Sequence, residues 1–202
     1  LHKYPFGKFP LPSEAPWYEP LSLLTMIASH TTKIKLATAI LIAPLRNPAL
    51  LAKTVATLDT ISKGRLELGV GLGWQKEEFD TAGVSFEDRS EIFWETLDIC
   101  KLLWQDSPIS FHGKHFNFDD IWCHPQPTQG QNLPLLFGLK MTHENAQRIS
   151  KVGHGWIPIK TSRDFISAGK DILMEAFIKE GRQDQPRIRG QLPTCVDNNG
   201  VP

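Results

Sequence analysis

The chain has 202 residues, 41% of them hydrophobic and 22% charged, a composition typical of a globular protein with enough apolar side chains to form a core. Lysine plus arginine and aspartate plus glutamate number 22 each, so the charge balance argues against nucleic acid as a partner and against an acidic tail. The longest apolar run covers residues 36–45, well short of the roughly 20 residues of a membrane-spanning helix. Three widely separated cysteines, Cys100, Cys123 and Cys195, predict reduced thiols and a cytoplasmic protein.

Both ends of the chain predict a piece of a longer protein. Leu1–Pro16 carries four prolines and is expected to be a loop, whose aromatic residues either pack over a pocket or simply cover the fold. Asp197–Gly200 is a turn signal that normally leads into a further element. We therefore expect the chain to be a fragment.

The first part of the chain predicts two helices and two strands in alternation. A helix runs from Glu19-Pro20 to His30, and an almost wholly apolar run at residues 34–43 is typical of a parallel strand covered on both faces. Asn47-Pro48, an N-cap followed by proline, predicts the start of the second helix, and Lys63-Gly64 predicts its end. A buried strand from Arg65 to Gly71 completes a right-handed βαβ unit.

The middle of the chain predicts two further helices. A short one is expected at Trp74–Asp80, and Ser85–Asp88 is a capping box, with aspartate in place of glutamate, that opens a long amphipathic helix. Four apolar side chains at helical spacing predict a face of that helix packed into the core. They are Phe93, Leu97, Cys100 and Trp104.

Residues 108–127 interrupt the alternation of strands and helices. Short segments of alternating apolar and polar residues around His112-Gly113-Lys114 predict a hairpin insertion there. The alternation then resumes with three more predicted strands, at residues 134–138, 155–159 and 187–196. Thr142 is expected to cap the first intervening helix, and Thr161-x-x-Asp164 predicts a capping box for the second.

Five parallel strands alternating with helices are consistent with an open doubly wound sheet or with a section of a (β/α)8 barrel. No linker divides the sequence, so residues 1–202 are expected to form a single, partial domain with the hairpin inserted near residues 108–127. In either architecture, ligands bind at the carboxyl ends of the strands.

The glycines at the end of the strand from Arg65 to Gly71 carry two interpretations. Gly69-x-Gly71-x-Gly73 lacks the last glycine of the dinucleotide-binding fingerprint, because Trp74 is followed by Gln75 and Lys76. The glycines are then either the rim of a cofactor site or a plain strand-terminating turn. On the first interpretation, Gly73→Val is expected to weaken cofactor binding more than stability, because the new side chain would enter the pocket.

Other candidate chemistries are disfavoured. The spacing of His112, His115, Cys123 and His124 matches no common zinc pattern, so we expect no metal. No G-x-S-x-G elbow indicates a serine hydrolase. Glu77 and Glu78 are adjacent and would point about 100° apart on a helix, which argues against a paired acid and base.

The segment from Phe137 to Thr142 predicts a strand end, a turn at Gly138 and the start of a helix. The start of a helix presents free N–H groups and a partial positive charge to anions, and Lys140 would add a full charge. This segment is therefore a candidate phosphate site, the alternative being an ordinary turn between strand and helix.

Taken together, these residues resemble the bacterial luciferase-like family, and within it the oxidoreductases that use the deazaflavin coenzyme F420. The likeness covers nearly the whole chain and is most specific between Ala52 and Phe79. The residues that carry it are Leu36-Ala37-Thr38, Pro44-Leu45-Arg46-Asn47-Pro48, Ala52 to Asp59, Ser62 to Leu66, Gly69-Val70-Gly71, Gly73-Trp74, Glu77-Glu78-Phe79, Gly83-Val84 and Arg89.

The resemblance implies a TIM (β/α)8 barrel of the luciferase-like type, incomplete here with about five strands, and usually a homodimer. It places a flavin or deazaflavin at the carboxyl ends of the strands, with a non-proline cis peptide at Thr38-Ala39-Ile40 beside the ring. Gly138 to Met141 would hold the phosphate, although Leu139 stands where the family commonly has a second glycine. The implied cofactor-binding residues are Thr38, Ala39, Ile40, Gly71, Gly73, Trp74, Glu77, Gly138, Leu139, Lys140 and Met141.

The function predicted from this resemblance is hydride transfer between coenzyme F420 and a small organic substrate, with no nucleic acid or membrane partner. The alternatives are an FMN-dependent luciferase-like monooxygenase and a non-catalytic luciferase-fold binding protein. Family members carry an acidic residue and a histidine near the ring, in a segment that would precede Leu1. We therefore name no catalytic residue.

Overall fold

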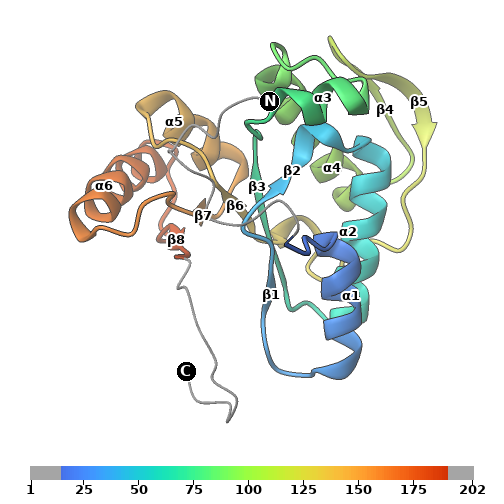
Figure 1. The fold of residues 1–202 in the computed structure, drawn as a ribbon, viewed down its shortest axis with the longest axis horizontal. Helices are drawn as coiled ribbons and strands as arrows, with labels where there is room; N and C mark the ends of the chain where they lie inside the picture. Colours follow the sequence, from blue (N-terminus) through green and yellow to red (C-terminus); the bar gives the residue numbers. More distant parts are fainter. Residues whose placement is uncertain (1–14, 191–202) are drawn as a thin grey trace. The chain divides into compact units, whose positions relative to one another are not determined.

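The computed structural model describes residues 15–190 and divides the chain after Leu135 into two units (Figure 1). No helix in this range is both long and apolar enough to cross a membrane. The predictions for Cys195 and Asp197–Gly200 lie outside the described residues, as does nearly all of the predicted loop Leu1–Pro16. The prediction of a single domain stays a prediction.

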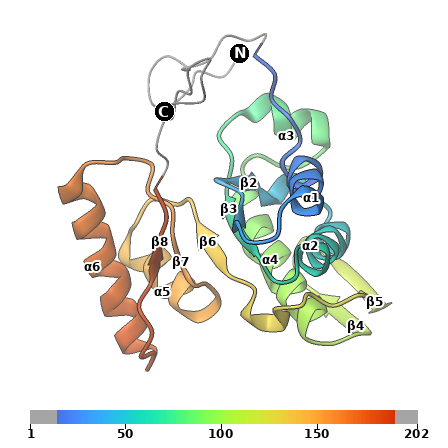
Figure 2. The ribbon, with the colours of Figure 1, turned by 90° about the horizontal axis from the view of Figure 1, so that it is seen from below.

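The first unit contains a βαβ arrangement followed by two helices and a hairpin. Strands β1 and β2 both pair with β3 in parallel. Helix α2 packs against α1 and α4, and both views show these three helices on one side of the strands (Figures 1 and 2). The elements are α1 Pro20–His30, β1 Leu36–Ala37, β2 Leu41–Ile42, η1 Ala43–Leu45, α2 Pro48–Ser62, β3 Leu66–Gly71, α3 Lys76–Ala82, α4 Arg89–Gln105, β4 Ile109–His112, β5 Asn117–Ile121 and η2 Gly130–Asn132.

The predicted ends of α2 and the predicted strand β3 are confirmed. The Asn47 side chain accepts a hydrogen bond from the Leu50 N–H at 3.1 Å, and Pro48 is the first helical residue. Lys63 ends the helix in the left-handed conformation, with φ at 57°. All six residues of β3 are buried, as expected for a strand covered on both faces.

Helix α4 is confirmed in its packing and corrected in its start. The predicted stripe is buried, because Phe93, Leu97, Cys100 and Trp104 are each at most 1% exposed. The Ser85 hydroxyl accepts a hydrogen bond from the Asp88 N–H at 3.2 Å, but this closes a turn, and the helix begins at Arg89. Helix α3 likewise begins at Lys76 rather than Trp74, because the backbone is still extended at Gln75.

The predicted hairpin forms between β4 and β5, which pair antiparallel. An isolated two-stranded hairpin is marginally stable in water, so its attachment to α4 matters. The Glu95 carboxylate accepts hydrogen bonds from the backbone N–H groups of Lys114, His115 and Phe116, at 2.8, 3.0 and 3.2 Å. One helical carboxylate therefore anchors the turn of the hairpin.

The second unit pairs three short parallel strands, with β7 in contact with both β6 and β8. Its elements are β6 Leu135–Phe137, whose first residue is the last of the first unit, α5 His143–Val152, β7 Gly155–Trp156, α6 Arg163–Lys179 and β8 Arg187–Ile188. Thr142 caps α5 as predicted, since its side chain accepts from the Asn145 N–H. The capping box at Thr161 is wrong, because the N-cap of α6 is Ser162 and its side chain makes no capping hydrogen bond. Strand β7 is shorter than predicted.

Trp156 organises the core of the second unit. Its ring is fully buried, and its indole N–H donates to the Leu139 carbonyl at 2.9 Å. A Cβ on Gly169 of α6 would lie 2.3 Å from the ring, so this glycine allows the helix to approach the tryptophan. Phe165 packs beside the same ring at a centroid distance of 5.6 Å. Trp156 therefore links β7, α6 and the loop after β6.

Glu19 caps α1, and its hydrogen bonds should make the stability of the fold depend on pH in the acid range. Its carboxylate accepts from the Ser22 N–H at 2.7 Å and from the Arg46 guanidinium at 2.8 Å. Partial burial alone would raise the pKa of Glu19, but these bonds outweigh it and lower the pKa from 4.5 to about 2. A carboxyl with a depressed pKa stabilises the fold above its unfolded-state pKa and loses that contribution as the pH falls through its folded-state pKa.

We expect Glu19→Gln to lower the free energy of unfolding at pH 7 by about 1–2 kcal/mol, a value reduced for the exposure of the side chain. The difference between wild type and variant should stay constant above about pH 5 and shrink toward pH 2. Urea unfolding at several pH values measures it. A difference that did not change with pH would show that the Glu19 charge contributes nothing.

Candidate functional site

The first candidate surface lies at the carboxyl ends of β2 and β3, where the predicted strand at residues 34–43 proves to be broken. Three residues, Thr38 to Ile40, lie between Ala37 and Leu41, whereas two lie between their partners Glu67 and Val70. The first strand therefore carries one extra residue, a bulge, between β1 and β2. The predicted non-proline cis peptide is confirmed at Ala39-Ile40.

Thr38 closes this bulge. Its hydroxyl donates to the Gly69 carbonyl at 2.7 Å and accepts from the Gly69 N–H at 3.0 Å. Thr38 is 3% exposed, whereas Ala39 is exposed and Ile40 is half-buried. The two residues after Thr38 are thus the accessible part of the bulge.

Gly73 follows β3, and both its backbone conformation and the packing around it require glycine. Its φ is +77°, a value that L side chains rarely adopt, and a Cβ would lie 2.8 Å from Ile42 Cγ2 and 3.0 Å from Phe79 Cε2. A side chain at this position would enter the packing between β2 and α3. The predicted cause of a Gly73→Val effect, entry of the side chain into a ligand pocket, is therefore wrong, because the side chain would meet Ile42 and Phe79.

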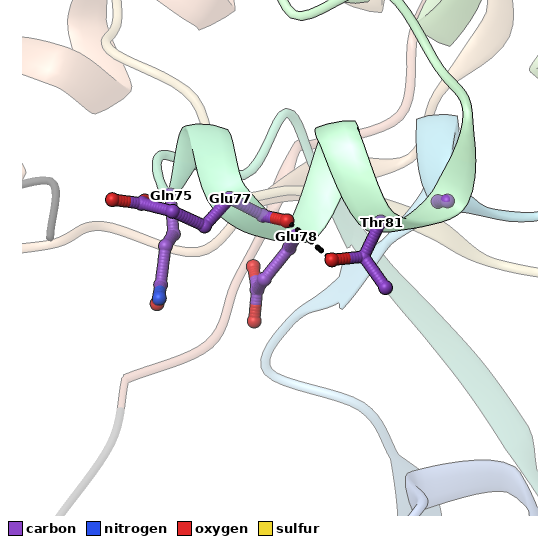
Figure 3. Close-up of a pocket in the computed structure, with 5 residues that line it drawn as sticks. Gln75, Glu77, Glu78 and Thr81 are labelled. Atoms are coloured by element: carbon purple, nitrogen blue, oxygen red, sulfur yellow. Dashed lines mark hydrogen bonds between the residues drawn. The ribbon is translucent and has the colours of Figure 1, made fainter.

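The other predicted residues of this surface continue from β3 into α3. Gly71 is buried at the end of β3, paired with Ile42, and Trp74 is half-buried. Glu77 and Glu78 leave α3 in different directions, as predicted, beside an open hollow (Figure 3). Burial and the neighbouring Glu77 raise the pKa of Glu78. The residues lining the hollow are Gln75, Glu77, Glu78, Thr81 and Ala82.

The second candidate surface is the loop from Gly138 to Met141, between β6 and α5. Two of its carbonyls are used internally: that of Leu139 accepts from the Trp156 indole, and that of Lys140 accepts from the Thr142 N–H at 3.0 Å and the Asn145 amide at 2.9 Å. Within residues 15–190 no acceptor receives a hydrogen bond from the backbone N–H groups of this loop. The loop therefore presents donors at the start of a helix, where an anion is favoured.

The four residues of this loop differ in how far they are exposed to solvent. Leu139 is 5% exposed and belongs to the core, which gives a packing reason for leucine at the place of the second glycine. Lys140 is exposed, and Met141 and Gly138 are half-buried. Asn145 and Trp156, which hold the loop carbonyls, were not among the predicted site residues. The only signal for Asn145 was its position three residues after the Thr142 cap.

The structure places the predicted site residues in two groups that belong to different units. Thr38, Ala39, Ile40, Gly71, Gly73, Trp74 and Glu77 lie in the first unit, and Gly138, Leu139, Lys140 and Met141 in the second. Among residues 15–190 no three histidine, cysteine or acidic side chains gather as a metal site. His112 contacts Asp119 at 3.1 Å and His115 contacts Glu91 at 3.0 Å.

A family model described as luciferase-like monooxygenase matches residues 2–200. An F420-dependent glucose-6-phosphate dehydrogenase of Kineococcus radiotolerans is 29% identical over 178 residues, 86% of this chain and 51% of that protein. An FMNH(2)-dependent dimethylsulfone monooxygenase of Pseudomonas putida is 30% identical over 138 residues, 66% of this chain and 38% of that protein.

Among solved structures, monooxygenase RslO1 of Streptomyces bottropensis superposes with a TM-score of 0.78 at 23% identity, over 85% of this chain and 53% of that one. The predicted fold class, a luciferase-like (β/α)8 barrel present in part, is confirmed. The chain spans about half the length of the curated relatives it matches.

Proposed function

The chain belongs to the luciferase-like monooxygenase family, and we propose that the whole protein is an oxidoreductase that transfers hydride between coenzyme F420 and a small organic substrate. One observation carries the proposal: at the start of α5 the carbonyls of Leu139 and Lys140 accept hydrogen bonds, while the backbone N–H groups of Gly138 to Met141 have no acceptor among residues 15–190. Backbone donors at a helix N-terminus fit a cofactor phosphate.

Each part of this loop has a role in the proposal. The N–H groups of Gly138 to Met141 bind the phosphate, and the Trp156 indole and the Asn145 amide hold the loop through the carbonyls of Leu139 and Lys140. Lys140 adds an exposed positive charge, which favours a cofactor with several negative charges along its tail. F420 supplies the hydride chemistry when bound, and the protein supplies binding and orientation.

Support for F420 also comes from the dehydrogenase of Kineococcus radiotolerans, whose name states the use of this coenzyme. The second candidate, an FMN-dependent monooxygenase, is supported by the dimethylsulfone monooxygenase, whose name states FMNH(2). The residues of the first unit that the sequence places at the ring stay a prediction, as do the homodimer and the cytoplasmic location.

Titration of the whole protein with F420 and with FMN, followed by fluorescence, tests the proposal. We expect F420 to bind more tightly than FMN. Tight FMN binding without F420 binding would establish the monooxygenase alternative, and a folded protein that binds neither would indicate a non-catalytic luciferase-fold protein.

Lys140→Ala is expected to weaken F420 binding about three- to tenfold at low ionic strength, because it removes one exposed charge beside the phosphate. The loss should shrink at high salt, where exposed charges are screened. Lys151→Ala is the matched control, since Lys151 is an exposed lysine in the last turn of the same helix. Equal losses for the two variants would mean that the effect is one of overall charge and would contradict a phosphate site at this loop.

A further inference from the structure

The bulge between β1 and β2 leaves Gly69 of β3 facing a strand with one residue too many. In a regular parallel pair, the N–H and the carbonyl of such a residue bond to backbone groups of the neighbouring strand. At a bulge the ladder is locally disrupted and these bonds are lost. Gly69 lies in the fully buried strand β3, where an unpaired backbone group is costly.

The Thr38 hydroxyl replaces both missing backbone partners at once. A hydroxyl is one donor and an acceptor, and here the donor is used on the Gly69 carbonyl and the acceptor on the Gly69 N–H. The two bonds tie the start of the bulge to a single residue of β3. Ala39 and Ile40, the accessible residues, begin immediately after this attachment.

We infer that Thr38 is a positioning residue, whose hydroxyl sets the path of Ala39 and Ile40 and thereby shapes the surface predicted to meet the cofactor ring. The inference rests on the proposed function for what that surface binds. The side chain of Thr38 acts through the backbone, because its hydroxyl is engaged on Gly69 and the residue is 3% exposed.

Three variants of the whole protein separate the hydroxyl from the shape of the side chain. Thr38→Val keeps the shape and removes both bonds, and Thr38→Ser keeps the hydroxyl. Thr96→Val is the matched control, because Thr96 is also fully buried, in α4, and its hydroxyl has no hydrogen-bond partner among residues 15–190.

The first readout is amide hydrogen exchange in the protein without cofactor. In Thr38→Val we expect exchange at Gly69, Ala39 and Ile40 to accelerate by about tenfold or more, because the bulge is no longer held. In Thr38→Ser and Thr96→Val exchange at these amides should stay within about threefold of wild type.

The second readout is the dissociation constant of F420. We expect it to rise by about tenfold or more in Thr38→Val and to change by less than about threefold in the other two variants. Unchanged exchange and affinity in Thr38→Val would overturn the inference. A loss of affinity in Thr38→Ser as large as that in Thr38→Val would also overturn it. If Thr38→Val does not fold, the comparison of Thr38→Ser with wild type decides the matter. If wild type binds no F420, the proposed function fails, while the exchange data still judge the role of Thr38.

Discussion

Arg65→Met is expected to lower the free energy of unfolding by about 3–5 kcal/mol, one of the largest effects that a single substitution should produce in this chain. Arg65 is 8% exposed. Its guanidinium donates five hydrogen bonds, to the carbonyls of Ser62, Ala28, Thr31 and Ile34 and to the Thr31 hydroxyl, at 2.7 to 3.0 Å.

These acceptors explain the size of the expected loss. Carbonyls at the end of a helix have no intrahelical partner, and Ala28 and Ser62 lie in the last turns of α1 and α2. One planar side chain therefore satisfies the ends of two helices and the turn before β1, and methionine would leave all four carbonyls unpaired.

Urea unfolding at 25 °C measures this loss, with Lys33→Met as the control. Lys33 is an exposed cation in the same turn, so its replacement should change stability by less than about 0.5 kcal/mol. A loss below about 1 kcal/mol in Arg65→Met would show that water replaces the guanidinium at these carbonyls and would contradict the assigned role.

Gly73→Val is the second large effect, and we expect it to destabilise the protein by about 3–5 kcal/mol even without cofactor. Two costs add. Valine is strained at a φ of +77°, and its Cβ would lie 2.8 Å from Ile42 Cγ2 and 3.0 Å from Phe79 Cε2.

Gly83→Val separates the two costs, because Gly83 also has a positive φ, +68°, while nothing lies within 4 Å of its Cβ position. It should carry the strain alone, about 1–3 kcal/mol. The measurement is chemical unfolding of both variants in the cofactor-free protein. If the two variants lost equal stability, the close approach of Ile42 and Phe79 would have no energetic consequence.

The parts of the fold that depend on neighbours in sequence could be predicted. The N-cap and proline at Asn47-Pro48 and the stripe beginning at Phe93 act within a few residues, and the structure has both. The break at Thr38–Ile40 could not be predicted from the apolar run, because it depends on the register with β3, some 30 residues away. Its position came instead from the family resemblance.

The side chains whose roles could not be predicted act through contacts with residues that are distant in the sequence. Arg65 stands next to a strand in the sequence, but four of its five hydrogen bonds go to residues 31 to 37 positions earlier. The sequence around Gly73 does not indicate that Ile42 lies close to it in the fold. Trp156 and Asn145 hold the loop from Gly138 to Met141. Its place between a strand end and a helix start was predicted, while the two residues that hold it were not.

We propose that the loop from Gly138 to Met141 binds the cofactor phosphate, and amide hydrogen exchange of the whole protein with and without F420 tests this directly. We predict that exchange at these four amides slows by about tenfold or more when F420 is bound, because N–H groups that have no acceptor among residues 15–190 gain one from the phosphate. Binding of F420, seen by fluorescence, with unchanged exchange at these amides would contradict the claim.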